Sequence, residues 1–322
     1  LLLDGWSVPI LLREVFLCYE SFCRGDGVPS LPAARPFRDY IGWLERQDLQ
    51  EAESYWRETL GGTSGATVLA KRNGAAGAGA VRSAEERVRL TKQRSEQVRA
   101  FGQREKVTVN TIVQGAWALV LSGISQEREV LFGATVSGRP AELAGAGEMV
   151  GLFINTLPVR VRVRAGEERG RWLRELQSEQ IKSREFEYSP LWRIRQWAGL
   201  GADRQLFESI LVFENYPIEE VVSETGKALK VSKFMYLDPP QSELLLMVVP
   251  GNEILFRLLY SPAIYTPETV RGLLTNLESA LFSLVEEGRA RLGEIGFVRE
   301  NIRTYKPDEE IEKSLFHDEF AF

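Results

Sequence analysis

The order of apolar and polar residues along the chain predicts a mixture of helices and strands. Apolar residues recur at helical spacing over residues 8–23, about 49–60, within 107–125, over 168–186 and over 266–287. Each of these segments is long enough for a helix that buries one apolar face. The pattern therefore predicts five amphipathic or buried helices.

Residue types at the helix ends support this interpretation. Ser7 is the expected cap of the first helix and Gly25 its expected end, Gly61 ends the second, and Thr266 caps the last. The predicted buried stripe of the first helix consists of Ile10, Leu11, Leu12, Val15, Phe16 and Tyr19. The predicted inward positions of the helix at 168–186 are Trp172, Leu173, Leu176 and Ile181.

Other segments have the pattern of strands. The run EVLFGATVSGR (129–139) predicts a buried strand, and LPVRVRVRAG (157–166) alternates Val and Arg as a strand with one wet face does. Further strands are expected around 206–213 and 230–237, and residues 243–260 predict a hairpin that turns through Pro-Gly-Asn. This mixed order predicts an α/β (α+β) fold with open mixed sheets covered by helices.

Composition excludes several classes of partner. The chain has 322 residues, 44% hydrophobic and 26% charged, with 40 Lys and Arg against 45 Asp and Glu. No dense basic block with interleaved aromatic residues is present, which argues against nucleic acid as a partner. Every apolar run is shorter than the ~20 residues that span a bilayer, so no membrane segment or membrane partner is predicted.

Cysteine use and the start of the chain indicate where the protein works. Cys18 and Cys23 lie five residues apart on one predicted helix, where their side chains diverge, so a disulfide framework is not expected. This is consistent with a protein of the reducing cytoplasm. Leu1 is expected to be an internal residue rather than the start of a signal peptide, because no Met or basic region precedes the apolar run. The Gly- and Ala-rich segment 61–80 is the predicted internal boundary.

The residues of the chain offer no obvious catalytic group. A glycine-rich phosphate loop, a G-x-S-x-G elbow, and Cys or His pairs at metal-ligand spacing are all absent, so no metal site is predicted. The single histidine, His317, lies in a charged segment near the end, and no Ser/His or Cys/His pair can form within the chain.

The first seven residues, LLLDGWS, resemble the end of the H-H-x-x-x-D-G motif of nonribosomal peptide synthetase condensation domains. Three residues separate the second His from the Asp in that motif, and Leu1, Leu2 and Leu3 occupy these positions here. The resemblance therefore implies that both histidines stand immediately before Leu1.

Further blocks are similar to the same family. PFRDYIGWLE (36–45) resembles its aromatic-x-D-Y-x-x-W block, and EMVGLFINTLPVRV (148–161) closely matches its V-G-x-F-[VI]-N-T-L-x-x-R block. EFEYSPLWRIRQWAG (185–199) resembles a later block but carries Glu185 where His is common, and DRQLFESILVFENYP (203–217) keeps part of an R-N-P-L-F pattern.

The resemblance implies a chloramphenicol acetyltransferase-like fold of two lobes with the active site at their junction. Residues 1–60 would be the end of the N-terminal lobe and the crossover, residues 61–302 the complete C-terminal lobe, and residues 303–322 the linker and start of an adenylation domain. It also implies amide formation between a donor acyl or peptidyl thioester and an acceptor aminoacyl thioester. Both are carried on phosphopantetheine of carrier protein partners, and no cofactor binds directly. The fragment itself is expected to be inactive without the second His.

The resemblance assigns roles to several residues and leaves alternatives open. Asp4 is expected to pair with an arginine, either Arg139 or one outside the chain, and an Asx turn is its plainer interpretation. Gly5 lets the backbone approach the thioester or is a turn glycine. Trp6 and Ser7 follow the motif, with Ser7 expected to act as the helix cap.

Other residues are interpreted in the same way. Asn155 is either a substrate contact near the tunnel or a satisfied buried amide, and Gly151 permits close packing or a bulge. Trp192 and Trp197 are expected to be core or lobe-contact residues. The set Arg160, Arg162 and Arg164 either attracts an acidic carrier protein or is a solvated strand face.

Three rival functions remain open at this point. An epimerization domain shares the fold but usually has D-G-V-S-W where this chain has Asp4-Gly5-Trp6-Ser7. A free-standing acyltransferase that uses coenzyme A is disfavoured by the adenylation-like tail. A catalytically inactive condensation-like scaffold would have a pair other than His-His before Leu1.

Overall fold

The computed structural model describes residues 2–31, 33–63, 65–69, 83–201, 204–214, 243–286, 288 and 291–295. Within these residues the strands form one six-stranded mixed sheet with the order β1-β6-β5-β4-β2-β3. The strands are β1 (Ala84–Arg89), β2 (Glu129–Val136), β3 (Asn155–Arg162), β4 (Ser209–Phe213), β5 (Leu244–Val249) and β6 (Leu255–Tyr260). The expected α/β fold with an open mixed sheet is therefore confirmed.

The sheet combines a parallel centre with antiparallel edges. β4 runs parallel to both β2 and β5, whereas β3 pairs antiparallel with β2 and β1 pairs antiparallel with β6. β5 and β6 form the antiparallel hairpin that the sequence predicted, with Val249 opposite Leu255. The strand predicted at 230–237 lies outside the described residues.

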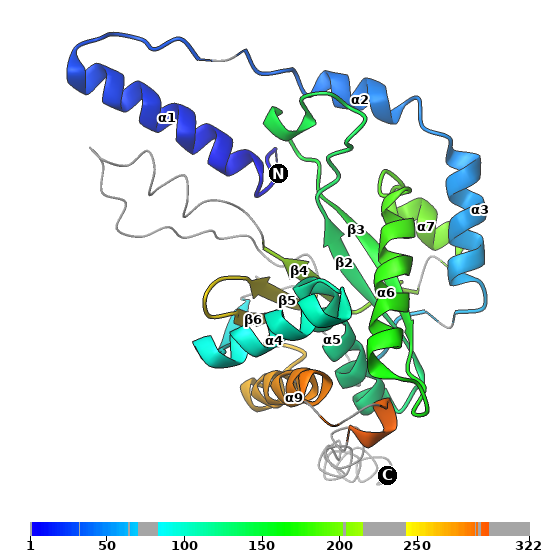
Figure 1. Ribbon diagram of the computed structural model, residues 1–322. Helices are drawn as coiled ribbons and strands as arrows, with labels where there is room; N and C mark the ends of the chain where they lie inside the picture. Colours follow the sequence, from blue (N-terminus) through cyan, green and yellow to red (C-terminus); the bar gives the residue numbers. More distant parts are fainter. Residues whose placement is uncertain are drawn as a thin grey trace, which may run out of the picture.

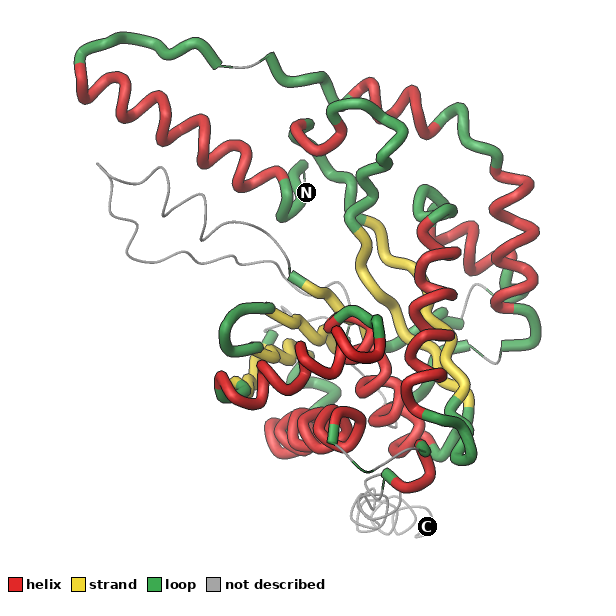
Figure 2. Tube along the Cα trace, in the orientation of Figure 1, coloured by secondary structure: helices red, strands yellow, loops and turns green. Residues whose placement is uncertain are grey.

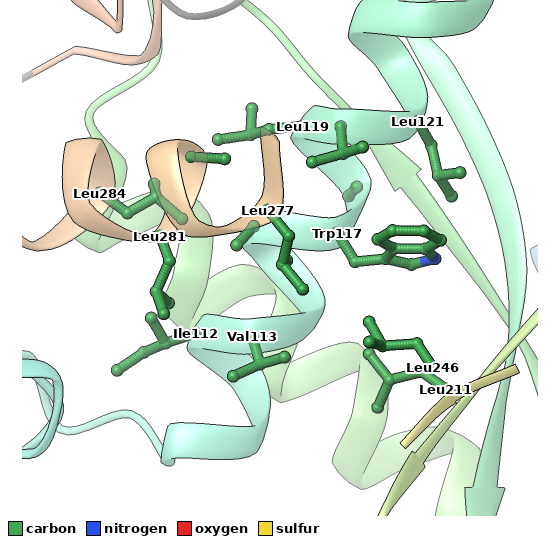
Figure 3. Close-up of a cluster of buried hydrophobic side chains, with 14 of the residues drawn as sticks. Ile112, Val113, Trp117, Leu119, Leu121, Leu211, Leu246, Leu277, Leu281 and Leu284 are labelled. Carbon is green, nitrogen blue, oxygen red and sulfur yellow. The ribbon is translucent and has the colours of Figure 1, made fainter. Parts of the chain in front are cut away.

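One face of the sheet is covered by helices α4 (Lys92–Glu105), α5 (Val109–Ser125), α6 (Arg169–Arg184) and α9 (Pro267–Val285) (Figure 1). The central helix α5 is buried from Thr111 to Gly123, because α9 lies on one side of it and the sheet on the other. Figure 3 shows Trp117 and Val113 of α5 beside Leu211 and Leu246 of the sheet. This layer contains the main hydrophobic core of the described residues.

A smaller core lies on the opposite face of β2 and β3. Helices α3 (Leu49–Leu60) and α7 (Leu191–Trp197) cover this face, and Trp56 is fully buried there. Successive residues of β2 point to opposite sides, so Phe132 faces the main core while Leu131 faces the smaller one. Both faces of β2 are therefore buried.

Helix α1 (Ser7–Arg24) stands apart from both cores (Figure 2). It ends at Gly25 in a left-handed conformation, as predicted, but Ser7 is its first helical residue and not its cap. The predicted buried stripe is confirmed at Ile10 and Phe16, which are buried, but it is wrong at Val15, which is 58% exposed, and at Tyr19, which is also exposed. Within the described residues, α1 contacts the rest of the molecule mainly through its N-terminal end, next to residues 148–151.

Several other sequence expectations can be compared with the structure. α3, α5 and α9 lie where helices were predicted, and Thr266 caps α9 through the N–H of Thr269. The prediction for Ile181 is wrong, since α6 buries Trp172, Leu173 and Leu176 but leaves Ile181 exposed. The remaining described helices are α2 (Arg38–Leu44) and two short 3-10 turns, η1 (Ala146–Glu148) and η2 (Leu292–Glu294).

Cys18 and Cys23 on α1 are both free thiols. In the part of the chain that the structure describes, no single helix has the length and apolar content needed to cross a membrane, and the bent pair α4 and α5 meets that test only when taken together.

Candidate functional site

The turn before α1 is organised around the buried carboxylate of Asp4. Oδ1 accepts hydrogen bonds from the Ser7 backbone N–H and hydroxyl, both at 2.8 Å, and Oδ2 accepts from the Phe153 N–H at 3.1 Å. Arg139 Nη2 donates to Oδ1 at 3.1 Å. We call Asp4, Ser7, Arg139, Gly151 and Phe153 the Asp4 cluster. Asp4 thus serves both as an ion-pair partner and as the acceptor for the first turn of α1.

Ser7 connects this turn to a segment 144 residues further along the chain. Its Oγ accepts from the Gly151 N–H at 3.0 Å and from Arg139 Nη2 at 3.1 Å, and the Gly151 carbonyl is a second acceptor for its proton at 2.9 Å. The Gly151 carbonyl also accepts from the Asp4 N–H. Ser7 is fully buried, so the prediction that it only caps the helix is wrong. Its hydroxyl joins two loops.

Arg139 is held on three sides. Nη1 donates to the carbonyls of Ala146 at 2.6 Å and Met149 at 2.8 Å, while Nη2 faces Asp4. The guanidinium lies 4.1 Å from the centre of the Phe153 ring. Only 8% of the Arg139 side chain and none of the Asp4 side chain is exposed. Of the two partners left open by the sequence for Asp4, the structure places Arg139 against it.

Two glycines permit the close approach of the loops in the Asp4 cluster. A Cβ at Gly151 would lie 2.2 Å from Cδ2 of Phe37, so the predicted close packing is present. Gly138 has a φ of +62°, and a Cβ there would lie 1.9 Å from the Phe153 carbonyl oxygen. Both positions therefore need a residue without a side chain.

Asn155 ties the start of β3 to the turn between α6 and α7. Its Nδ2 donates to the carbonyls of Glu187 and Ser189, both at 2.8 Å. The Ser189 hydroxyl in turn accepts from the indole N–H of buried Trp56 at 3.0 Å. Both protons of the Asn155 amide are thus used to fix the backbone of the turn, and its side chain also lines an adjacent groove.

This open groove lies beside the Asp4 cluster and has a volume of about 490 Å³. We call it the Glu187 groove. Apolar and aromatic side chains of α2, the loop before β3 and the turn after α6 form most of its walls, and the exposed Leu2 also lines it. Its lining residues are Leu2, Phe37, Tyr40, Ile41, Leu44, Leu152, Ile154, Asn155, Glu187, Tyr188 and Pro190.

Aromatic packing fixes the wall between the groove and the Asp4 cluster. The Tyr40 ring lies 4.4 Å from that of Phe153, and the Phe37 ring meets Phe153 edge-on at 5.0 Å. The pKa of Tyr40 is raised to about 12, chiefly by burial and then by the Glu187 carboxylate, while Arg139 opposes the rise. Tyr40 is therefore a neutral phenol that lies between the Asp4 cluster and Glu187.

Glu187 was not singled out from the sequence. Burial raises its pKa above the ordinary value, Arg184 lowers it, and Glu142 raises it. Among the described residues, none donates a hydrogen bond to its carboxylate. A glutamate in an aromatic stretch after a helix carries no sign that its side chain faces a groove, which is why sequence reasoning missed it.

A second groove, of about 520 Å³, follows the outer edge of β3 between α3 and α6. Arg160, Arg162 and Arg164 contribute to its walls. Arg160 and Arg162 both pair with Glu129, at 2.6 Å and 2.7 Å. Glu129 pairs with two of the three arginines, and acidic residues of α3, α6 and the loop before α6 line the same groove, so this edge fits a solvated strand face better than an attractive patch.

The remaining candidates lie apart from the Glu187 groove. Gly5 is buried in the turn before α1, and Trp6 is partly buried beside it. Trp197 is buried in the smaller core, whereas Trp192 is 60% exposed and is not a core residue. His317 lies outside the described residues. No group of three or more His, Cys, Asp or Glu in the described ranges could hold a metal ion.

Comparison with known proteins identifies relatives of the whole described region. The sequence model of the family described as Condensation domain matches residues 1–303. The chain is 38% identical over 304 residues to one of the linear gramicidin synthase proteins of Brevibacillus parabrevis, covering 94% of this chain and 4% of that protein. It is 31% identical over 307 residues to surfactin synthase subunit 3 of Bacillus subtilis (strain 168), covering 95% and 24% respectively. The chain thus spans a small part of these relatives.

Solved structures show the same fold. The first condensation domain of the calcium-dependent antibiotic synthetase, in complex with a substrate analogue, has a TM-score of 0.73 at 17% identity, covering 91% of this chain and 66% of that one. The X-domain from teicoplanin biosynthesis has a TM-score of 0.73 at 19% identity, covering 90% and 68%. At these identities the likeness concerns the fold alone.

Proposed function

Because this chain belongs to the condensation-domain family found in nonribosomal peptide synthetases, we propose that in its intact protein it forms an amide bond between two carrier-bound substrates. The acceptor amine attacks the thioester carbonyl of the donor acyl or peptidyl group. The C–N bond forms, the C–S bond breaks, and the departing thiolate of the donor arm takes up the proton that the amine loses. Both substrates are carried on phosphopantetheine of carrier proteins.

The observation that supports this proposal most is the buried Asp4 cluster. Residues Leu1 to Gly5 match the x-x-x-D-G end of the family's H-H-x-x-x-D-G motif, and the turn at Asp4 is fixed by the Asp4 and Arg139 pair at 3.1 Å. A loop held by a buried ion pair and by hydrogen bonds to Ser7 and Phe153 has little freedom. Such rigidity is what a loop needs if it presents catalytic side chains at its start.

The catalytic histidines belong immediately before Leu1 in this proposal. The second His would act as general base or position the amine, since neutral imidazole with a pKa near ~6.5 suits either role. Asp4, Ser7 and Arg139 then act as positioning residues that hold the loop, and Gly151 allows the loops to meet. Gly5 and Trp6 lie next to the reacting groups in the same motif.

The rest of the chain is divided as the resemblance implies. Residues 1–60 close the N-terminal lobe and form the crossover, residues 61–302 form the C-terminal lobe, and residues 303–322 lead into an adenylation domain. Carrier proteins and that adenylation domain are the proposed partners. Two free thiols on α1 support a reducing, cytoplasmic location.

The test begins with the sequence upstream of Leu1. The intact domain is then assayed with two loaded carrier proteins, with and without alanine at the second His, and the amide product is measured by mass spectrometry. A His-His pair and a loss of amide formation in the alanine variant are the expected results, with no turnover by the 322-residue chain alone. Any other pair before Leu1 would favour an inactive scaffold, and inversion of a Cα centre without amide formation would favour an epimerase.

A further inference from the structure

We propose that Glu187 binds the amino group of the acceptor aminoacyl thioester, with the Glu187 groove as the site that receives it. This inference rests on the proposed function and adds a binding residue to it. The proposed contact is ionic, between the Glu187 carboxylate and the substrate amino group, and Glu187 forms no covalent bond.

The position of the groove supports the assignment. Leu2 lines the groove and stands directly ahead of the turn that the Asp4 cluster holds. The Asn155 Nδ2 donates its two protons to the backbone carbonyl oxygens of Glu187 and Ser189, both at 2.8 Å. These hydrogen bonds fix the backbone that carries the Glu187 side chain. A carboxylate on a fixed turn, in the same groove as Leu2 of the proposed catalytic loop, is suitably placed to orient a substrate group.

The charge balance of the groove indicates what it binds. Its other described walls are apolar or neutral, including the Tyr40 phenol, whose pKa is about 12. Glu187 receives no hydrogen bond from any described residue, although Arg184 lies close enough to lower its pKa. A partly desolvated carboxylate without a donor is costly, and a ligand with N–H donors and positive charge would offset that cost. The amino group of an aminoacyl thioester has both properties in its protonated form.

The chemistry of the reaction fits the same contact. An aminoacyl thioester carries its amino group on the carbon next to the acyl carbon, and this amine must reach the reactive loop, so a groove beside that loop is placed to contact it. Once the ammonium group has given one proton to the general base of the proposed reaction, the Glu187 carboxylate accepts one of the two remaining N–H groups, which leaves the nitrogen lone pair free to face the donor carbonyl. Glu187 would therefore bind and orient the nucleophile.

The experiment compares two probes that differ in one amino group. The glycyl amide and the acetyl amide of aminopantetheine are stable analogues of an acceptor with and without its amine. Their dissociation constants are measured on the intact synthetase, as wild type, as Glu187→Gln and as Glu185→Gln. Glu185 is exposed and lies two residues away on the same turn, so its substitution removes one negative charge without changing the groove.

We expect wild type and Glu185→Gln to bind the glycyl probe about tenfold more tightly than the acetyl probe, because a hydrogen bond to a charged group is lost with the amine. Glu187→Gln should bind the two probes with about equal dissociation constants. Circular dichroism of each variant confirms that it is folded.

Two outcomes would overturn the inference. The first is a wild-type protein that binds both probes equally, as happens if another part of the protein fills the groove. The second is a preference that survives in Glu187→Gln. Amide formation by the wild type is measured separately: a Glu187-dependent preference without any amide product would reject the proposed function and keep the amine site.

Discussion

Replacing Arg139 by alanine tests whether the Asp4 cluster is held by its buried charges. The substitution removes the ion pair to Asp4, the donors to the carbonyls of Ala146 and Met149, and the contact with the Phe153 ring. Asp4 then keeps its fully buried carboxylate with three remaining donors, from Ser7 and from the Phe153 N–H. The cluster should open locally long before the main core unfolds.

The size of the effect follows from burial. Removing one partner of a buried ion pair costs about 3–5 kcal/mol, and we expect the lower end because Asp4 retains other donors. Arg162→Ala is the matched control. Its pair with Glu129 is shorter, at 2.7 Å against 3.1 Å, but 57% of the Arg162 side chain is exposed. An exposed pair is worth about 0–1 kcal/mol, so burial and not distance should decide the order.

Hydrogen exchange read by mass spectrometry measures this opening directly on the 322-residue chain. The Ser7, Gly151 and Phe153 amides all donate within the cluster. A cost of about 3 kcal/mol corresponds to exchange about 10²-fold faster in peptides that contain them. Arg162→Ala should accelerate exchange in β3 by less than about fivefold. Equal effects of the two substitutions on their own segments would refute the reasoning.

Three further substitutions test other parts of the site. Gly151→Ala should cost about 1–3 kcal/mol in urea unfolding, because its Cβ meets the Phe37 ring, whereas Gly147→Ala meets no atom within 4 Å and should be neutral. Ser7→Ala should cost about 1–3 kcal/mol and speed exchange of the Gly151 amide, which loses its acceptor. Glu187→Gln should raise the unfolding temperature at pH 7, since the raised pKa of Glu187 means that its charge opposes folding above that pKa. The gain should vanish below about pH 4, where the carboxyl is protonated in both states.

The fold was largely predictable because its signals are local. Thr266 followed by Pro267 marks the start of α9, and the alternation of Val159, Arg160 and Val161 marks β3. The sequence did not indicate which side of a helix would be covered. Val15 and Ile181 lie at apolar positions of helical patterns yet are exposed, because coverage depends on which segments pack nearby rather than on spacing.

Of the candidate site, only the residues within or near recognisable sequence motifs could be predicted. LLLDGWS indicated Asp4, and VSGRP suggested Arg139 as one partner, but the hydroxyl of Ser7 was assigned to helix capping. Its actual contacts lie 144 residues away, at Gly151, and no local rule predicts a bond of that range. Glu187 was missed for the same reason, because its environment comes from α2 and the start of β3.

The attachment of α1 to the described residues through its N-terminal half, by the Asp4 cluster and the Arg13–Glu148 ion pair, has a geometric consequence. An α-helix rises about 1.5 Å per residue, so the 18 residues of α1 make a rod about 27 Å long. A tilt of about 5° at the fixed end displaces the far end by about 2.4 Å, while atoms near Ser7 move by a few tenths of an ångström. The direction of α1 therefore depends on the hydrogen bonds around Asp4 and on the Arg13–Glu148 ion pair. A displacement of a few tenths of an ångström near Ser7 therefore corresponds to a displacement of about 2.4 Å at Arg24.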